Sequence, residues 1–384
     1  MVSGDFPYPP NHGGRKDVWD KINALIENGY KVDLISTIKE TPTDIHLKFV
    51  EELLDNVLLI KRNMKIRMFF SFLPMQYKSR EQLANVKLVN QYDYVLVEGD
   101  YVLPILNNPE INGEIIFRMH NNEARYFIQL MKSEKSIFKK LYYFTESFKF
   151  KVLNNVIISK LKTIWFISMD ELKEYSSSNP EFRGYFVPPH VEQNFSAPNI
   201  IDNKNVLFIG SLFMVNNVEA VIWYLINVHD YISEKYPNYT FIIAGNTKNQ
   251  TLSWLYNTIK SVKFKGNIEI IESPEYLDDL YSKCSIFVNP MQHGAGIKLK
   301  TIEPLQKGLA VVSTPIGAEG TGLENEKHIM IAHSQENFIE SVDRLLSNEQ
   351  MRINLVKNSQ YYLSENYDLI KKLNSLFSQN HKKN

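Results

Sequence analysis

Short apolar runs of four to six residues recur along the chain, and polar or glycine-rich stretches separate them. Runs of this length that are rich in Val, Ile, Leu and Phe favour strands over helices. They predict strands at 32–36, 57–60, 94–97, 115–119, 164–167 and 186–191 in the first half, and at 206–209, 241–244, 268–271, 285–288, 309–313 and 329–332 in the second. Because continuous apolar runs are typical of strands buried on both faces, we expect parallel sheets.

Between these strands, apolar residues recur at helical spacing. The clearest stripe, formed by Val18, Ile22, Leu25 and Ile26, predicts a helix over residues 17–28. Further helices are predicted at 131–160, 169–175, 217–233, 251–261, 276–282, 335–346 and 349–362. Alternating strands and helices predict an α/β fold, here two doubly wound, Rossmann-like domains that face each other across a cleft.

The length of the chain, 384 residues, exceeds what one ordinary hydrophobic core supports, so we expect two domains. We place the N-terminal domain at 1–190, a proline-stiffened linker at 191–203, the C-terminal domain at 204–365 and a final helix or tail at 366–384. Only residues 1–3 remain for a first strand before the loop that contains Gly13 and Gly14.

Composition excludes several classes of protein. The formal net charge is zero, which argues against a general nucleic-acid binder. The single cysteine, Cys284, excludes an internal disulfide and a cysteine-cluster metal site, and it fits a reducing compartment. No apolar run is long enough to cross a bilayer and no signal peptide is evident, so we expect a cytoplasmic protein.

Residues 61–80 mix lysine and arginine with Met, Phe and Leu. A segment of this composition either packs on the core with solvated cations, which we favour, or lies against an anionic lipid surface. The second interpretation gives a peripheral location at the inner face of the membrane.

The stretch from Cys284 to Gly322 carries the strongest chemical signal. It predicts a strand, a glycine loop with Gly294 and Gly296, a short helix and a second strand. Glycines let a backbone approach a ligand closely, and a helix start attracts anions. Lys298 and Lys300 add positive charge, while Glu303, on the same helical face as Lys300, can accept hydrogen bonds from a diol. These groups suit a nucleotide; a tight βαβ turn with a surface Lys300–Glu303 pair is the alternative.

The same stretch contains a G-x-G-x-x-x-K-x-x-E run, then V-V-S-T, then G-x-E-G. The residues in register are Gly294, Gly296, Lys300, Glu303, Gly308, Val311, Val312, Thr314, Gly317, Glu319 and Gly320. It resembles the signature of family-4 (group 1) glycosyltransferases, which are retaining enzymes of GT-B fold that use nucleotide sugars. The resemblance implies transfer of a hexose-type sugar to a growing surface or exported glycan, or to a lipid-linked acceptor. It also implies that neither a metal nor another cofactor is needed.

The resemblance further implies site residues. In the N-terminal domain, on the acceptor side, Gly13 and Gly14 would face the donor diphosphate, and His120, at the end of a predicted strand, would act on the transferred sugar. Arg118, Asn121 and Glu123 surround His120 in the sequence. In the C-terminal, donor-binding domain, Glu303 would hold the ribose. The other donor-binding positions there are Gly210, Ser211, His293, Gly294, Gly296, Lys298 and Lys300.

Three positions depart from the pattern of the family. Ser211 and Asn216 stand where many relatives carry an arginine and a lysine, so the diphosphate must rely on Lys298, Lys300 and backbone amides. His293 replaces the first of two glutamates. Pro304 replaces an alanine, so we expect the helix to begin near residues 300–303 or to kink there.

Three other functions fit parts of the sequence. A nucleotide-sugar epimerase of GT-B fold would share both domains, and a non-catalytic nucleotide-sugar-binding subunit would tolerate the departures at Ser211, Asn216 and His293. A nicotinamide-dependent dehydrogenase is disfavoured because no G-x-G-x-x-G follows a predicted strand with an acid about twenty residues later.

Overall fold

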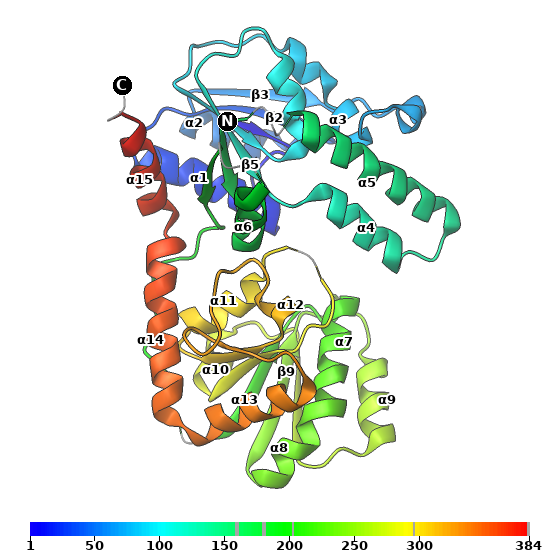
Figure 1. Cartoon of the computed structure of the whole chain (residues 1–384), viewed down its shortest axis with the longest axis vertical. Coiled ribbons are helices and arrows are strands. Elements are labelled where there is room, and N and C mark those ends of the chain that lie inside the picture. The colour runs from blue at the N-terminus through cyan, green and yellow to red at the C-terminus, as the bar shows by residue number, and fades with distance from the viewer. Residues whose placement is uncertain (158–160, 179–181, 202, 295, 382–384) are drawn as a thin grey trace. The chain divides into compact units, whose positions relative to one another are not determined.

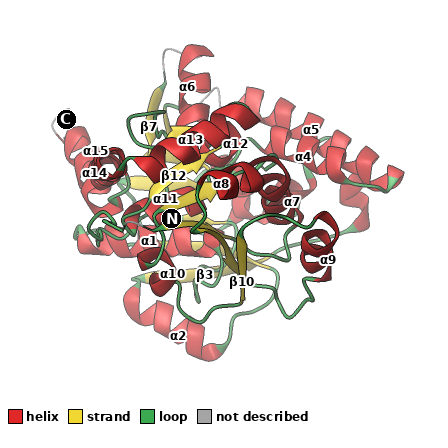
Figure 2. Ribbon diagram, turned by 90° about the horizontal axis from the view of Figure 1, so that it is seen from below, coloured by secondary structure: helices red, strands yellow, loops and turns green. Residues whose placement is uncertain are grey.

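The structure, a computed structural model, describes the whole chain except residues 158–160, 179–181, 202, 295 and 382–384. The chain forms two compact units: Met1–Val191 together with Asn366–Asn384, and Glu192–Glu365. Each unit contains one parallel sheet, and helices pack around the sheet (Figures 1 and 2). The expected α/β fold with two doubly wound units is therefore confirmed. None of the described helices is long and apolar enough to cross a membrane.

The N-terminal unit contains a seven-stranded sheet in the order β3-β2-β1-β4-β5-β6-β7. Its strands are β1 (Val2–Ser3), β2 (Asp33–Ile38), β3 (Asn56–Lys61), β4 (Tyr94–Glu98), β5 (Glu114–Met119), β6 (Thr163–Phe166) and β7 (Arg183–Phe186). The first strand is as short as expected, yet it is central, because Val2 aligns with both Ile35 and Val97. The strand predicted at 186–191 is wrong: β7 ends at Phe186, and Pro188 and Pro189 have no N–H with which to continue a ladder.

The helices of the N-terminal unit include two that the apolar pattern does not predict, at 44–53 and 75–78, and they differ from the predictions at two further places. They are α1 (Gly13–Glu27), α2 (Asp44–Leu53), α3 (Met75–Lys78), α4 (Glu123–Ser133), α5 (Ile137–Ile157), α6 (Met169–Ser178) and α15 (Leu369–His381). The helix predicted from residue 17 begins at Gly13, so Gly13 and Gly14 form its first turn instead of a loop; the side chain of His12 caps it by accepting from the N–H of Arg15. The single helical segment predicted at 131–160 is two helices that meet at 134–136, and its last three residues lie outside the described ones.

The last helix, α15, lies beside α1 (Figure 1). The ring of Phe377 contacts those of Tyr30, Tyr94 and Trp165, which come from the turn between α1 and β2, from β4 and from β6. The end of the chain therefore completes the core of the unit that contains the beginning of the chain.

The C-terminal unit contains a six-stranded sheet in the order β10-β9-β8-β11-β12-β13. Its strands are β8 (Lys204–Ile209), β9 (Tyr239–Gly245), β10 (Asn267–Glu272), β11 (Ile286–Asn289), β12 (Ala310–Ser313) and β13 (Met330–Ile331). Its helices are α7 (Val215–Tyr224), α8 (Asp230–Lys235), α9 (Ser253–Val262), α10 (Asp278–Ser282), α11 (Leu299–Gln306), α12 (Pro315–Ala318), α13 (Gln335–Ser347) and α14 (Glu349–Asn366). A π-helical turn, Leu225–His229, separates α7 from α8 inside the helix predicted at 217–233.

In each sheet the strand order reverses beside a central strand, between β1 and β4 in the first and between β8 and β11 in the second. Open parallel sheets bind ligands at the carboxyl ends of the strands next to such a reversal. Gly13 follows β1, Gly210 follows β8 and the glycine loop follows β11, whereas His120 follows β5, the neighbour of β4.

Candidate functional site

In the C-terminal unit, Asn217 on α7 connects the loop that follows β8 to the first turn of α11. Its side-chain amide donates to the carbonyl of Ser211, at 3.0 Å, and its carbonyl accepts from Nζ of Lys300, at 2.7 Å. A Cβ on Gly210 would lie 3.1 Å from the side chain of Asn217, so glycine leaves room for this amide. The structure thus brings Lys300 close to Gly210 and Ser211, which lie about ninety residues earlier in the sequence.

Lys300 is a half-buried cation whose ammonium group has no acid beside it in the described part of the unit. Its Nζ lies 5.0 Å from the centroid of the Phe208 ring and bonds only the neutral amide of Asn217. Burial, and then the charge of Lys298, lowers the pKa of Lys300 to about 7. An anion placed here would restore the charged form.

Lys298 lies in the glycine loop and is almost fully buried. Its Nζ donates to the carbonyl of Gly296, at 2.5 Å, and lies 3.6 Å from a carboxylate oxygen of Glu319. Burial lowers the pKa of this lysine as well. Gly294, with φ of 146°, packs so closely that a Cβ would lie 3.3 Å from Cε of Lys298. The loop therefore wraps around the lysine.

In the turn that follows β12, close packing explains why position 317 is a glycine. A Cβ on Gly317 would lie 2.3 Å from Oγ of Ser313. The carbonyl of Gly317 accepts from Thr301 at 2.5 Å and from the buried amide of Asn289 at 3.1 Å. These bonds tie α11 and α12 to the end of β11, so the helix that carries Lys300 is fixed in place.

Glu303 lies on α11, half-buried, and hydrogen-bonds the side chain of Tyr281. Burial raises the pKa of its carboxyl group. No Lys300–Glu303 ion pair is found among the described residues, so the surface pair considered as an alternative is absent there. α11 begins at Leu299, just before the expected range of 300–303, so Pro304 lies inside the helix and beyond its first turn. His293 is exposed in the loop before it.

In the N-terminal unit, His120 belongs to a cluster of charged side chains. Its Nε2 lies 2.8 Å from Glu98 and 3.9 Å from Asp17. Lys21 lies 2.6 Å from Asp17 and 3.3 Å from Glu98, and Arg118 lies 2.9 Å from Asp17. The side chain of His120 is 29% exposed, whereas those of Lys21, Glu98 and Arg118 are fully buried. The imidazole is therefore the most accessible group of the cluster, and the side chain of Asp17 is 10% exposed.

Charges in this cluster balance without a further ion. Burial by itself would raise the pKa of Asp17, but Arg118 and Lys21 hold it well below its usual range. Glu98 behaves likewise: burial raises its pKa, and Lys21 and the hydrogen bond from His120 bring the net shift below the usual value. The ligand atoms of Asp17, Glu98 and His120 lie within 4.8 Å of one another, as in a metal site. Because two cations already pair with these carboxylates, the donor set is better satisfied as it stands.

Gly13 and Gly14 lie in the same unit, in the first turn of α1 and four and three residues before Asp17. A Cβ on Gly13 would meet no atom within 4 Å. The packing of the protein therefore does not demand glycine at this position, and its backbone is open to a ligand.

Glu123, expected near His120, instead accepts a hydrogen bond from the hydroxyl of Tyr101, at 2.7 Å. Burial raises the pKa of Glu123 to about 7, with a further contribution from Glu171. The neighbouring Asp100 is fully buried, and burial and Glu123 raise its pKa well above the usual value. This acidic pair is separate from the His120 cluster.

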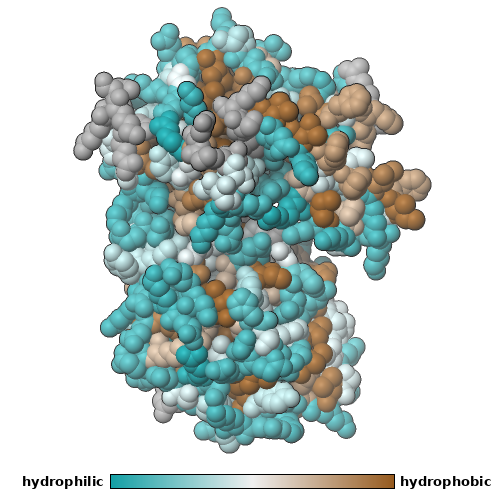
Figure 3. Space-filling model, viewed as in Figure 1, coloured by the Kyte–Doolittle hydropathy of each residue, from teal (hydrophilic) through white to brown (hydrophobic). Residues whose placement is uncertain are grey.

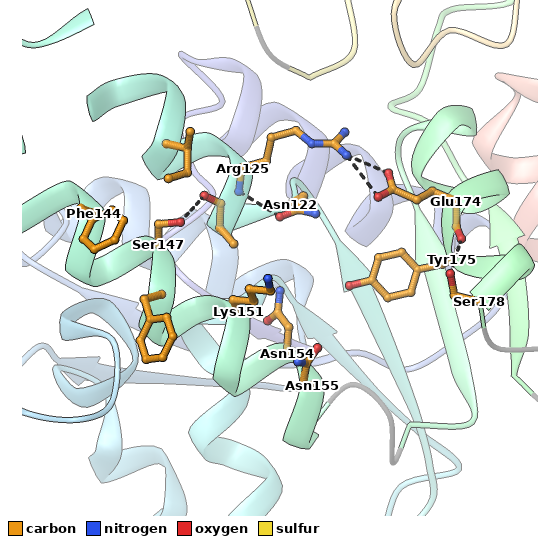
Figure 4. Close-up of a pocket in the computed structure, with 13 residues that line it drawn as sticks. Asn122, Arg125, Phe144, Ser147, Lys151, Asn154, Asn155, Glu174, Tyr175 and Ser178 are labelled. Atoms are coloured by element: carbon orange, nitrogen blue, oxygen red, sulfur yellow. Dashed lines mark hydrogen bonds and ion pairs between the residues drawn. The ribbon is translucent and has the colours of Figure 1, made fainter. Parts of the chain in front are cut away.

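A cavity of about 620 Å³ opens in the N-terminal unit between α4, α5 and α6 (Figure 4). Its wall joins the aromatic rings of Phe144, Phe148 and Tyr175 to the polar groups of Asn122, Lys151 and Asn154, among others. Asn154 is buried, and its Oδ1 has no hydrogen-bond partner among the residues that the structure describes. Aromatic faces beside amides and a cation suit a ring that carries hydroxyl groups.

Sequence analysis missed Asn217 and the partners Asp17, Lys21 and Glu98. A signal existed for two of them, because Asp17 and Lys21 are four residues apart on a predicted helix and can pair. Glu98 follows a predicted strand directly. For Asn217 only a through-space contact, with Lys300, reveals a role.

Comparisons with known proteins bear on both units. Residues 203–348 match the family described as "Glycosyl transferases group 1". A Klebsiella pneumoniae protein described as "Uncharacterized 44.6 kDa protein in cps region" is 38% identical over 391 residues, which cover 99% of each chain.

Solved structures show the same fold over the whole length. Sucrose-phosphate synthase of Thermosynechococcus elongatus superposes with a TM-score of 0.65 at 11% identity, covering 100% of this chain and 99% of that one. Anabaena Alr3699/HepE, solved in complex with UDP and glucose, gives 0.62 at 10% identity, with the same coverage. The two parallel-sheet units are those of the GT-B fold. Residues 203–348, in the C-terminal unit, therefore carry the group 1 glycosyltransferase domain.

Proposed function

We propose that the protein is a retaining glycosyltransferase that moves a hexose-type sugar from a nucleotide sugar to a growing surface or exported glycan. One observation carries the donor assignment: Lys298 and Lys300 are two buried or half-buried cations with one acid, Glu319, at 3.6 Å from the first. Two cations with a single acid between them, at the switch point of a parallel sheet, match a diphosphate. The cps-region relative supports a polysaccharide product.

The two lysines stabilise the negative charge that develops on the diphosphate as the glycosidic bond to it breaks. The carboxyl group of Glu303 accepts from the ribose hydroxyls, and the glycine loop lets backbone amides approach the phosphates. Ser211 and the amide of Asn217 complete the polar surroundings of Lys300.

His120 orients the sugar and stabilises the positive charge that develops on its ring. Glu98, 2.8 Å from Nε2, holds the imidazole. Retention follows if the acceptor attacks from the face that the diphosphate leaves, with a phosphate oxygen taking the proton of the acceptor. This route requires no metal, since the lysines supply the positive charge.

The glycan acceptor binds in the cavity between α4, α5 and α6. Asn122, which lines it, lies two residues after His120 in the chain. A substitution of Tyr175 by Ala, which removes one aromatic wall, should raise the KM for the acceptor and leave donor binding unchanged. Unchanged acceptor kinetics would remove this cavity from the mechanism.

The decisive test is transfer by the variants Lys300→Ala and Glu303→Ala, with a panel of nucleotide sugars that starts with UDP-glucose. Each should lose about 10²–10³-fold in kcat, the effect of removing one preorganised oxyanion donor. Full activity in both would refute the site.

Two controls separate the alternatives. An epimer formed from donor alone, without acceptor, would identify an epimerase. Donor binding with neither transfer nor hydrolysis would identify a binding subunit.

Cys284, the only cysteine, is buried and free, which fits a reducing, cytoplasmic compartment.

A further inference from the structure

Two arginines of the basic segment 61–80 turn toward the interior of the N-terminal unit. Hydrophobic side chains gather on the surface over this segment and over α5 (Figure 3). In contrast, the side chain of Arg62 is only 18% exposed, and Arg80 is 2% exposed. A buried guanidinium group loses its hydration, so these two cations need hydrogen-bond acceptors and negative charge inside the protein.

Hydrogen-bond acceptors are too few around Arg62. Its Nη2 donates to the carbonyl oxygen of Gly4, which also accepts from Nη2 of Arg80, at 3.3 Å, and from the hydroxyl of Thr37, at 2.9 Å. A carbonyl oxygen has two lone pairs, so it accommodates a third donor poorly. Nε of Arg62 is buried and has no hydrogen-bond partner among the described residues. The guanidinium group of Arg62 therefore has donor capacity left for a ligand.

The arginine cluster, Arg15, Arg62 and Arg80, pairs with a single acid in the described part of the chain. Asp5 lies 2.9 Å from Nε of Arg15 and 3.8 Å from Nη2 of Arg62. The partners of Arg80 among the described residues are all neutral. Burial, and then the charge of Arg62, lowers the pKa of Arg80 to about 9. A bound anion would offset this excess of positive charge.

The arginine cluster lies at the edge of the sheet that carries His120. Gly4 follows β1, Arg62 follows β3 and His120 follows β5. Arg80 lies over the ring of Tyr101, which comes after β4, with Cζ 5.3 Å from the ring centroid. The carboxyl ends of parallel strands meet at one edge, where such sheets bind substrates. A Cβ on Gly4 would meet no atom within 4 Å, so space is open beside the cluster.

The donor diphosphate already has its own cations under the proposed function, Lys298 and Lys300 of the C-terminal unit. The acceptor attacks the sugar that His120 orients, so it must reach the sheet edge that carries the arginine cluster. The planar fork of an arginine matches two oxygens of a carboxylate or a phosphate ester. An acidic group on the acceptor therefore fits the cluster better than the donor does.

We propose that the arginine cluster is a subsite for an anionic group, a carboxylate or a phosphate ester, on a sugar of the acceptor. Arg15 and Arg62 contact the oxygens of this group, and the deeper Arg80 holds Gly4 in place and adds positive charge. The inference rests on the proposed transfer reaction and goes beyond it, because it makes the acceptor an acidic glycan. The cavity between α4, α5 and α6 remains the site of an uncharged part of the same glycan.

The experiment titrates the full chain with glucose, glucuronate and glucose 6-phosphate and follows binding by ligand-observed NMR. The three probes share one ring and differ in its charged group, so they distinguish a carboxylate from a phosphate ester. At least one acidic sugar should bind at least about tenfold more tightly than glucose, the effect of hydrogen bonds to an ion. Arg62→Met should remove this difference.

Arg183→Met is the matched control and should bind the probes as wild type does. Arg183 is a 40% exposed arginine of the same unit that pairs with Glu114, at 2.7 Å. It lies at the start of β7, and therefore at the opposite edge of the sheet.

Asp5→Asn separates a binding role from a structural one. Removing the carboxylate that competes for Arg15 and Arg62 should tighten binding of the acidic sugar by about two- to fivefold, the strength of a partly exposed ion pair. A purely structural cluster would gain nothing. Thermal unfolding checks that Arg62→Met is folded, and Asp5→Asn decides if it is not.

The transfer assay identifies the substrate that carries the anion. Arg62→Met should raise the KM for the acceptor about tenfold and leave the KM for the donor unchanged. A change in the KM for the donor alone would assign the cluster to the diphosphate and overturn the proposal.

The proposal also fails if neither acidic sugar binds better than glucose, if Arg62→Met and Asp5→Asn both bind as wild type does, or if Lys300→Met loses the binding in place of Arg62→Met. Binding of the probes needs no transfer. An inactive protein with binding that depends on Arg62 would therefore contradict the proposed reaction and not the anion site.

Discussion

The two units differ in how their buried charges are compensated. Around His120, two carboxylates meet Lys21 and Arg118, and each charge is paired within the protein. At the glycine loop, Lys300 bonds only an amide and Lys298 has one acid at 3.6 Å. The first arrangement stabilises a geometry, whereas the second leaves positive charge that a ligand can neutralise. We therefore expect the paired charges to position His120 and the unpaired charge of Lys300 to bind a ligand.

The largest effect is expected from breaking the paired cluster. Arg118→Met leaves Asp17 buried with less compensation, which should cost about 3–5 kcal/mol in the free energy of unfolding. Urea unfolding measures it. The control Arg125→Met removes the exposed pair with Glu174, at 2.9 Å, and should cost less than about 1 kcal/mol. Equal losses in the two variants would show that the His120 cluster is not a buried ion network.

The same kind of substitution in the second unit should affect binding and not stability. Lys300→Met removes a cation that burial already disfavours, so the free energy of unfolding should stay unchanged or rise. Affinity for nucleoside diphosphates should fall by about 2–5 kcal/mol, measured by calorimetry. Lys307→Met, which removes a surface pair with Asp278 at the end of the same helix, is the control. If Lys300→Met lowered the free energy of unfolding and kept the affinity for nucleoside diphosphates, Lys300 would be a structural and not a binding residue.

Asn217→Asp should give Lys300 a paired charge within the protein, like the charges around His120. The new carboxylate would lie about 2.7 Å from Nζ of Lys300 and neutralise it. We expect diphosphate affinity to fall by about tenfold, or about 1.4 kcal/mol. Asn216→Asp places the same charge one residue away and should bind nearly as wild type does. A stronger binder at position 217 would contradict a role for unpaired charge.

The smallest expected effect is the uptake of a proton by Lys300 when a diphosphate binds. Because burial and Lys298 lower the pKa of free Lys300 to about 7, a bound diphosphate should raise it toward 10.5. Between these values the complex binds more protons than the free protein, so affinity should fall as pH rises from about 7 to 10. Calorimetry at about pH 8.5 in two buffers of different ionisation enthalpy should show uptake of a fraction of a proton. Lys300→Arg, whose group stays charged, should remove it; persistent uptake would locate the proton elsewhere.

Apolar runs were sufficient to predict most of the strands, because a strand buried on both faces needs a continuous apolar run whatever surrounds it. The predictions failed where tertiary contacts or backbone chemistry compete with local pattern. The strand at 186–191 was cut short by two prolines, and the helix from residue 17 began earlier because the side chain of His12 caps it. The glycines and lysines of the glycine loop could be recognised because they lie close together in one segment.

Composition and local spacing fixed the fold class, the two-unit organisation and the cationic glycine loop, since each depends on neighbours in the chain. Contacts across the fold decided which charges are paired. Asp17 and Arg118 are 101 residues apart, Asn217 and Lys300 are 83 apart, and α15 packs on α1 from the far end of the chain. Whether a buried charge is satisfied depends on what lies within a few ångströms of it, and only folding brings those groups together.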